Sequence, residues 1–524
     1  MLIIKSRRKR ALHPDEPIRH ESHKRPVTRR DFLAQGFMAG GAALLAPSML
    51  GMLLNPRVSR ALSPDIQQMA TNICRITAGA GKIPFICFDL AGGASIAGSN
   101  VLVGGEGGQL DFLSTQGYSK QGLPGNMLPN NPTTNFINTE LGLAFHSDSA
   151  FLRGILEMTS PATRANINGA VIAARSENDT SNNPHNPMYG IARAGAKGEL
   201  LTLIGSQNSE SGGNSMAPAM LIDPINRPTK VDRTSDVTGL VDTGKLGELF
   251  EDSRDTVAVM ESMVRLSNAK VERVSTRLAD DAAIKDQFRC GYVKTADTVE
   301  KFSDPAALNP AADPDITGAG GVFGQNFGGD REFEKTAAVM KLVIEGYAGA
   351  GTVSMGGYDY HTGERATGEI RDLRAGRCMG ACLEFAARRG KPLMLYVFSD
   401  GSLSSNGRVD DSVNGRGKGE WTGDDQQVAA AFFLVYNPLG RPVLLEEDGI
   451  APERRQQLGY YSAGGDVVTS GSPAANNVNA LVQTVLLNYM ALHGEAGDFT
   501  TAFPSHSLGA TQVQRAMIAF NPIV

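Results

Sequence analysis

The chain has 524 residues and a formal charge of −5 at pH 7. Residues 1–61 contain 12 of the 50 Lys and Arg residues but only 4 of the 55 Asp and Glu residues, so residues 62–524 have a formal charge of −13. Because an acidic domain repels phosphate backbones, this charge excludes nucleic acid as an expected partner. The length suits one large domain with insertions or two domains.

The N-terminus has the layout of a twin-arginine export signal. Residues 28–33 read Thr-Arg-Arg-Asp-Phe-Leu, and a weakly hydrophobic run follows at 35–54. This run is only marginally apolar and no second span of about 20 apolar residues follows, which favours a cleavable signal over a membrane anchor. Arg60 occupies a place where signal cleavage sites usually have a neutral residue, so an uncleaved anchor is the alternative. We expect residues 1–61 to engage the twin-arginine export machinery and the remainder to work in the periplasm or at the cell surface.

Apolar runs and helical patterns alternate along residues 62–524. The short apolar runs, which are candidate strands, are 83–90, 152–159, 169–174, 200–204, 352–355, 393–398 and 429–436; the helical patterns are 245–302, 333–347, 370–389 and 481–492. Strands separated by helices predict an α/β fold in which helices cover both faces of a parallel sheet. We expect one domain over 62–524 with a helical insertion at about 240–330.

The five cysteines are an odd number, so at least one of them stays unpaired within a monomer. Cys378 and Cys382 lie four residues apart on one face of a predicted helix, where helix geometry disfavours a direct disulfide. We interpret this pair as small buried core residues.

Three predicted strands end in a carboxylate or imidazole next to glycine. These residues are Asp89, the pair Asp359 and His361, and Asp400. Because ligands of open α/β sheets bind beyond the carboxyl ends of the strands, we expect all four side chains to lie within about 10 Å of one another at one edge. Oxygen and imidazole donors that converge in this way suit a divalent metal. For each residue, the alternative is an ordinary turn or helix cap.

The same strand ends resemble the motifs of a known family. Residues 356–361, Gly-Gly-Tyr-Asp-Tyr-His, resemble a Gly-Gly-Trp-Asp-Thr-His motif of an uncharacterised twin-arginine-exported family in the alkaline phosphatase/sulfatase superfamily. Residues 398–401 resemble its Ser-Glu-Phe-Gly-Arg turn, and residues 88–93 resemble its first strand and glycine pair. The resemblance runs from about residue 82 to the C-terminus. It implies an alkaline-phosphatase-like α/β/α sandwich with a mostly parallel sheet, whose active members bind two divalent metals beside a Ser, Thr or modified Cys nucleophile.

The chain departs from the family pattern after the last of these motifs. The family has Asp-His-Gly where residues 419–425 here read Gly-Glu-Trp-Thr-Gly-Asp-Asp, so an imidazole is missing. Asp424 or Asp425 could replace it as an oxygen ligand, which favours Mg²⁺, Mn²⁺ or Ca²⁺ over Zn²⁺. The alternative is that the site has lost catalysis.

Two hydroxyl-bearing segments are candidates for a nucleophile. Thr180 and Ser181 follow the apolar run 169–174, and a hydroxyl at a helix start there could meet an incoming phosphate or sulfate. Residues 159–164, Thr-Ser-Pro-Ala-Thr-Arg, are the second candidate, although they lack a Cys. The alternative for both segments is an N-cap.

Two functions of different class follow from these residues. The first is a metal-dependent hydrolase whose partner is a small anionic ester, with phosphate or sulfate as the cleaved group. The second is a catalytically degenerate binding or assembly module that contacts an envelope protein in a secretion or surface-structure system. A similar fold does not decide between them, because function depends on the site.

Overall fold

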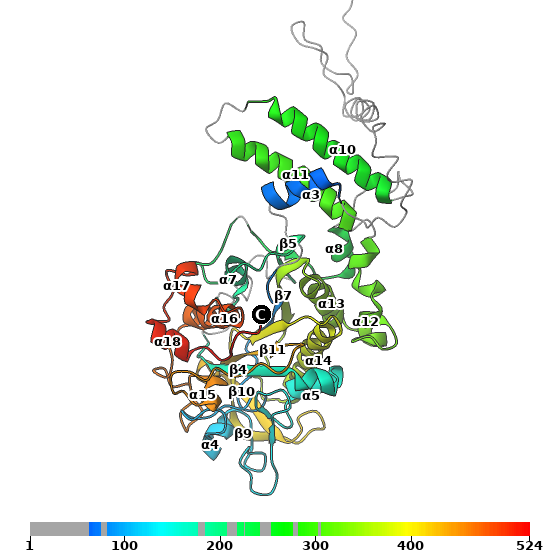
Figure 1. Cartoon of the computed structure of the whole chain (residues 1–524). Coiled ribbons are helices and arrows are strands. Elements are labelled where there is room, and N and C mark those ends of the chain that lie inside the picture. Colours follow the sequence, from blue (N-terminus) through cyan, green and yellow to red (C-terminus); the bar gives the residue numbers. More distant parts are fainter. Residues whose placement is uncertain are drawn as a thin grey trace, which may run out of the picture. The chain divides into compact units, whose positions relative to one another are not determined.

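The computed structural model describes residues 62–74, 81–176, 184–206, 217–224, 226–240, 253–275, 281–301 and 305–524. The chain divides into two compact units (Figure 1). A helical unit contains Met1–Ile76 and Thr243–Ser303, and a sheet unit contains Thr77–Asp242 and Asp304–Val524. The helical unit thus takes in most of the segment predicted as an insertion at about 240–330, and adds N-terminal residues to it. The twin-arginine motif at 28–33 and the hydrophobic run at 35–54 lie outside the described residues.

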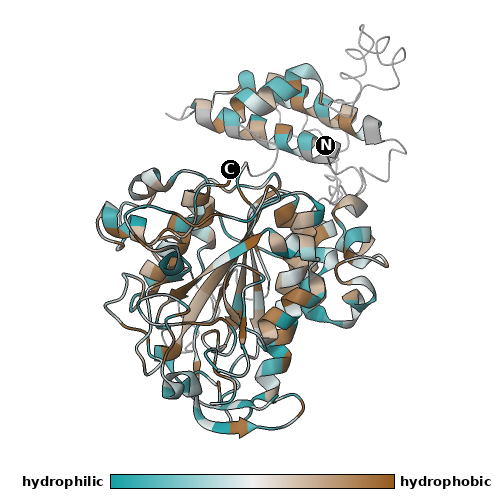
Figure 2. Ribbon diagram, turned by 60° about the horizontal axis from the view of Figure 1, so that its bottom comes forward, coloured by the Kyte–Doolittle hydropathy of each residue, from teal (hydrophilic) through white to brown (hydrophobic). Residues whose placement is uncertain are grey.

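An eight-stranded sheet forms the centre of the sheet unit. Its strand order is β12 (Gln457–Leu458), β4 (Ile167–Ala173), β11 (Ala430–Tyr436), β8 (Leu393–Phe398), β1 (Phe85–Ala91), β7 (Ala348–Gly356), β5 (Leu201–Gly205) and β6 (Thr229–Lys230). β11 is antiparallel to both β4 and β8, and all other neighbouring strands are parallel. The predicted α/β class with a mostly parallel sheet is therefore confirmed. Figure 2 shows hydrophobic residues gathered on the central strands, as expected where both faces are covered.

Helices cover both faces of this sheet. α7 (Met188–Arg193) and α16 (Val478–Leu492) share one apolar core with the inward side chains of β1, β4, β8 and β11. α13 (Arg331–Ile344) and α14 (Ala366–Arg388) contact the sheet strands from the other side, and α5 (Ala150–Met158) packs on α14. Cys378 and Cys382 are buried within α14 and form no disulfide, which confirms their predicted role as core residues.

The apolar run at 152–159 is helical, not a strand. It forms most of α5, whose start is capped by Ser149, since the Ser149 hydroxyl accepts a hydrogen bond from the Leu152 N–H. A short apolar run is compatible with the 3.6-residue period of a helix and with the two-residue period of a strand. Here the packing of the run on α14 favours the helix.

Shorter elements complete the sheet unit. The hairpin β9 (Leu403–Asp410) and β10 (Lys418–Asp424) is antiparallel, as is the pair β2 (Ile137–Asn138) and β3 (Phe145–His146). The short helices are α4 (Thr115–Lys120), α6 (Pro161–Ala165), α8 (Thr234–Gly239), α12 (Pro314–Thr317), α15 (Pro452–Arg455), α17 (Phe499–Ala502) and α18 (Thr511–Ala516).

The helical unit is built from α3 (Pro64–Gln68), α10 (Ser253–Glu272) and α11 (Asp281–Lys301). A small apolar core that includes Ile66, Val264 and Val293 joins the three helices, and a disulfide links Cys74 to Cys290. Within the described part of the chain, no helix combines the length and the apolar character that a membrane span requires.

Candidate metal centre

Asp359, His361 and Asp424 form a group that could hold a metal ion. One ligand atom from each residue lies within 4.8 Å of the other two. Nε2 of His361 is 2.8 Å from Oδ1 of Asp359 and 3.6 Å from Oδ2 of Asp424. The side chains are 56%, 33% and 50% exposed for Asp359, His361 and Asp424, so a solvated ion could reach all three.

The loop that follows β7 orients Asp359 and His361 by alternation along an extended chain. Gly357 begins this loop with a φ of +87°, a conformation that favours glycine. Tyr358 and Tyr360 are buried against α14, where the Tyr358 hydroxyl donates to the carbonyl of Arg371 and the Tyr360 hydroxyl donates to Asp372. Asp359 and His361 therefore both turn away from α14, as their spacing of two residues predicted.

Asp424 reaches the group because the β9–β10 hairpin is tied to the same loop. The Gly363 N–H donates to the carbonyl of Trp421 over 2.9 Å, and the indole of Trp421 lies 4.4 Å from the Arg365 guanidinium. Asp424 ends β10 within this hairpin. Asp425, the other predicted substitute, instead caps a short helical turn and pairs with Lys120 at 2.8 Å. The structure thus distinguishes the two neighbouring carboxylates.

Asp89 and Asp400 lie at the predicted edge of the sheet but do not belong to the group of three. Asp89 is buried inside β1, where its Oδ2 accepts a hydrogen bond from the Ser354 hydroxyl over 2.7 Å. Asp400 is buried just beyond β8, and its Oδ1 accepts a hydrogen bond from the Gly92 N–H over 2.7 Å. A Cβ on Gly92 would lie only 2.7 Å from the Asp359 nitrogen, so the turn after β1 lies between Asp400 and Asp359. Both buried carboxylates help to hold the strand ends in place.

The two predicted nucleophile segments have different outcomes. Thr180 and Ser181 lie outside the described residues. In the segment 159–164, Ser160 is the N-cap of α6 and accepts from the Thr163 N–H, while the Thr163 hydroxyl donates to Glu384. The cap interpretation therefore accounts for that segment.

A buried charged network behind the loop was not predicted. The Arg365 guanidinium and the Lys418 ammonium both donate to Oε1 of Glu369, at 2.9 and 2.8 Å. Burial alone would raise the pKa of Glu369, but Lys418 and Arg365 hold it below its usual value. Burial and the charge of Glu369 raise the pKa of Asp372 to about 7. Arg365 and Glu369 have the four-residue spacing of a helical ion pair, which is the one sequence signal that could have indicated the network.

Comparisons of the chain with protein-family models, curated proteins and solved structures found no match. The class of this protein is therefore described from its fold and its candidate site alone, without a known relative. It is an α/β protein with a mostly parallel sheet, beyond whose strands a three-residue group could hold a metal ion.

Proposed function

We propose that the protein resembles a metal-dependent hydrolase and that its substrates are phosphate or sulfate esters. The single observation that carries this proposal is the convergence of Asp359 and His361, from the loop after β7, with Asp424 at the end of β10. Two carboxylates and one imidazole are suitable donors for a divalent cation, and three protein donors leave coordination positions for water or substrate. A bound divalent ion would polarise the ester oxygen.

The donor set also bears on the choice of metal. Two of its three ligands are carboxylates, which suit hard cations such as Mg²⁺, Mn²⁺ and Ca²⁺ better than the imidazole- and thiolate-rich sites of Zn²⁺. Mn²⁺ accepts both imidazole and carboxylate ligands, so among these three hard cations it is the one that we expect to bind most tightly.

The second candidate function is a degenerate binding or assembly module with an envelope protein as partner. The observation that favours it is the engagement of Asp89 and Asp400 in the packing of the strand ends, outside the group of three. A second metal ion at this edge of the sheet would need carboxylates such as those of Asp89 and Asp400 as ligands. Under this proposal the fold serves as a scaffold, and any metal bound by Asp359, His361 and Asp424 stabilises the exposed loop.

We further propose an alkaline-phosphatase-like arrangement of the sheet and export of the protein to the periplasm or cell surface. The mostly parallel sheet between two helical layers supports the first of these proposals. The disulfide between Cys74 and Cys290 supports the second, because such bonds persist in oxidising compartments. Fractionation of the producing cells tests export, and recovery of the protein only from the cytoplasm would contradict it.

Metal titration tests the proposed centre. We expect Mn²⁺ to bind the wild-type protein, and His361→Ala or Asp359→Asn to weaken binding by more than about tenfold, because even outer-shell losses at metal sites cost that much. Asp411→Asn and His506→Ala remove the same groups elsewhere in the sheet unit and are the matched controls. Tyr360→Phe should change the affinity less, since that side chain is buried on the other side of the loop.

The outcomes separate the two candidate functions. Equal Mn²⁺ affinity in the wild-type and His361→Ala proteins would contradict the metal centre, leaving the contacts of His361 with Asp359 and Asp424 as ordinary surface contacts. Binding that depends on His361, together with hydrolysis of a nitrophenyl phosphate or sulfate, supports the hydrolase. Binding that depends on His361 without hydrolysis of either ester supports the module.

A further inference from the structure

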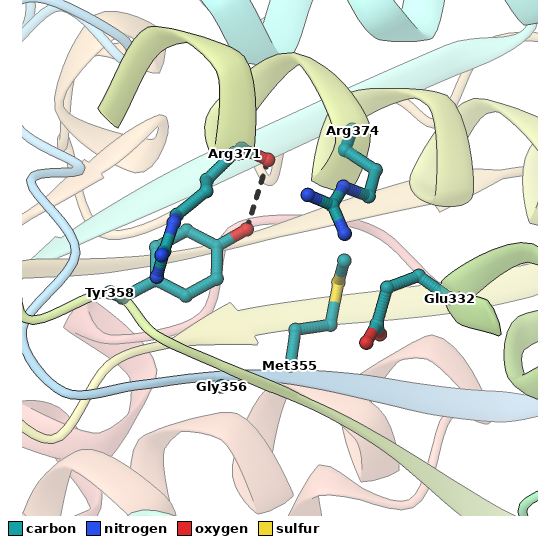
Figure 3. Close-up of a pocket in the computed structure, with 6 residues that line it drawn as sticks. All are labelled: Glu332, Met355, Gly356, Tyr358, Arg371 and Arg374. Atoms are coloured by element: carbon teal, nitrogen blue, oxygen red, sulfur yellow. Dashed lines mark hydrogen bonds between the residues drawn. The ribbon is translucent and has the colours of Figure 1, made fainter. Parts of the chain in front are cut away.

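A small pocket lies at the carboxyl end of β7, between this strand and the helices α13 and α14. Its volume is about 140 Å³, and its lining residues are Glu332, Met355, Gly356, Tyr358, Arg371 and Arg374. None of the three candidate metal ligands lines it. Figure 3 shows that Arg371 and Arg374 extend from the same helix toward the strand, while Glu332 approaches from α13. The pocket is therefore a feature distinct from the candidate metal centre, although both use the loop after Gly356.

Arg371 has a guanidinium that no acidic group among the described residues neutralises. Within the described ranges it forms no ion pair, and the Tyr358 hydroxyl donates to its backbone carbonyl, not to its side chain. Gly357 makes room for this side chain, because a Cβ at that position would overlap Nη1 of Arg371. Arg371 is half-buried as a residue and lines the pocket, where its guanidinium has donors available for a ligand.

Arg374 adds a second cation, three residues further along α14 and on the same side of the helix. Nε of Arg374 lies 3.7 Å from Oδ2 of Asp330, a distance that is long for a charge-assisted hydrogen bond. Both arginines thus keep donors that could serve a ligand.

The one acidic lining residue is already paired within the protein. Oε2 of Glu332 is 2.7 Å from Nζ of Lys335, a side chain that is fully buried. Because Lys335 offsets the charge of Glu332, the two arginines leave the pocket with an excess of positive charge. Tyr358 and Met355 supply buried, largely apolar walls on which the charges are less screened by water.

We propose that this pocket binds one phosphate or sulfate group, either as a free anion or as a substituent of a larger ligand. Arginine guanidinium groups present several N–H donors in a planar fork that matches the oxygens of such anions. The binding does not require a metal at Asp359, His361 and Asp424, so this inference is independent of the proposed hydrolase activity.

Calorimetric titration of the full chain with inorganic phosphate and with sulfate, at low salt and after treatment with EDTA, tests the pocket. We expect Arg371→Met and Arg374→Met each to weaken anion binding by about tenfold or more. Arg377→Met is the matched control, because it removes the same charge from α14 at a side chain that pairs with Glu157 outside the pocket. We expect Glu332→Gln to strengthen binding severalfold, a gain that misfolding cannot produce.

A phosphate monoester distinguishes the two sources of the anion. Monoester binding as tight as that of inorganic phosphate supports a group on a larger ligand, and binding of the inorganic anion alone supports a free anion. No binding of either anion to the wild-type protein would overturn the proposal. An equal loss of affinity in Arg377→Met and Arg371→Met would also overturn it, because the effect would then reflect net charge alone.

Discussion

The two units of this chain are stabilised in different ways. The sheet unit has an extended apolar core in which the central strands are buried along their whole length. Among the described residues, the helical unit has a core of seven buried apolar residues, two of them alanines, and the other residues of its long helices are mostly half-buried or exposed. It compensates with the disulfide between Cys74 and Cys290. Where burial supplies little stability, a covalent link replaces it.

Charged groups follow the same division. In the sheet unit, Arg365, Glu369 and Lys418 are buried together, and the loss of one partner would leave another charge unpaired inside the protein. In the helical unit, Arg265 and Asp65 are about half exposed, and a pair of this kind contributes little to stability. The comparison therefore predicts that the stability of the helical unit depends most on its disulfide, and that of the sheet unit on packing and buried charge.

The largest effect should come from removal of the disulfide. We expect the double variant Cys74→Ala/Cys290→Ala to lower the stability of the helical unit by about 2–5 kcal/mol and to leave the sheet unit unchanged. Hydrogen exchange of α10 and α11, compared with β1 and β7, measures this effect. The matched control is Cys378→Ala/Cys382→Ala, which should affect the sheet unit instead. If the Cys74→Ala/Cys290→Ala protein lost equal protection from hydrogen exchange in both units, the proposed difference between the units would be wrong.

The next largest effect concerns the buried carboxyl of Asp372. Burial, with the nearby charge of Glu369, raises its pKa to about 7 in the folded protein from an ordinary value of 3.8. The unfolded chain therefore releases this proton at lower pH, so this group lowers the free energy of unfolding as the pH rises from about 4 to about 7. We expect Asp372→Asn, which resembles the neutral form, to be the more stable protein at pH 8 by roughly 2–4 kcal/mol.

Denaturant unfolding of both proteins at pH 5 and pH 8 measures the Asp372 effect. The difference between the two proteins matters here, because other titrating groups contribute equally to both. An advantage of the Asn variant that is the same at pH 5 and pH 8 would show that the carboxyl of Asp372 does not titrate in this range.

The smallest effects should come from a matched pair of glycine substitutions in helices. Gly376 lies where α14 meets α5, and a Cβ there would overlap the Phe151 carbonyl oxygen, so we expect Gly376→Ala to destabilise the sheet unit by about 1–3 kcal/mol. Gly291 in α11 is exposed, with nothing within 4 Å of an added Cβ. We expect Gly291→Ala to stabilise the helical unit by about 0.5–1 kcal/mol. Thermal unfolding of both variants measures the pair, and a change of the same sign in both would contradict the packing difference.

Part of the fold and of the candidate site was readable from local sequence pattern. The apolar runs that became β1, β7 and β8 are long enough and bounded clearly enough to predict buried strands, and their alternation with helices predicted the parallel sheet. The two-residue spacing of Asp359 and His361 placed both side chains on one side of the loop. These features depend on neighbouring residues, whose geometry the backbone sets.

Other features depend on contacts between distant parts of the chain, and only the tertiary structure decided them. The run at 152–159 became a helix because it packs on α14, and Asp424 rather than Asp425 joined the group because of the hairpin register. The link between Cys74 and Cys290 spans 216 residues, and Arg371 meets the pocket at the end of β7 only after α14 has packed against the sheet. A local sequence pattern does not determine which distant segment a residue will contact, because the same pattern is compatible with many pairings of segments. The packing of the core selects one of these pairings.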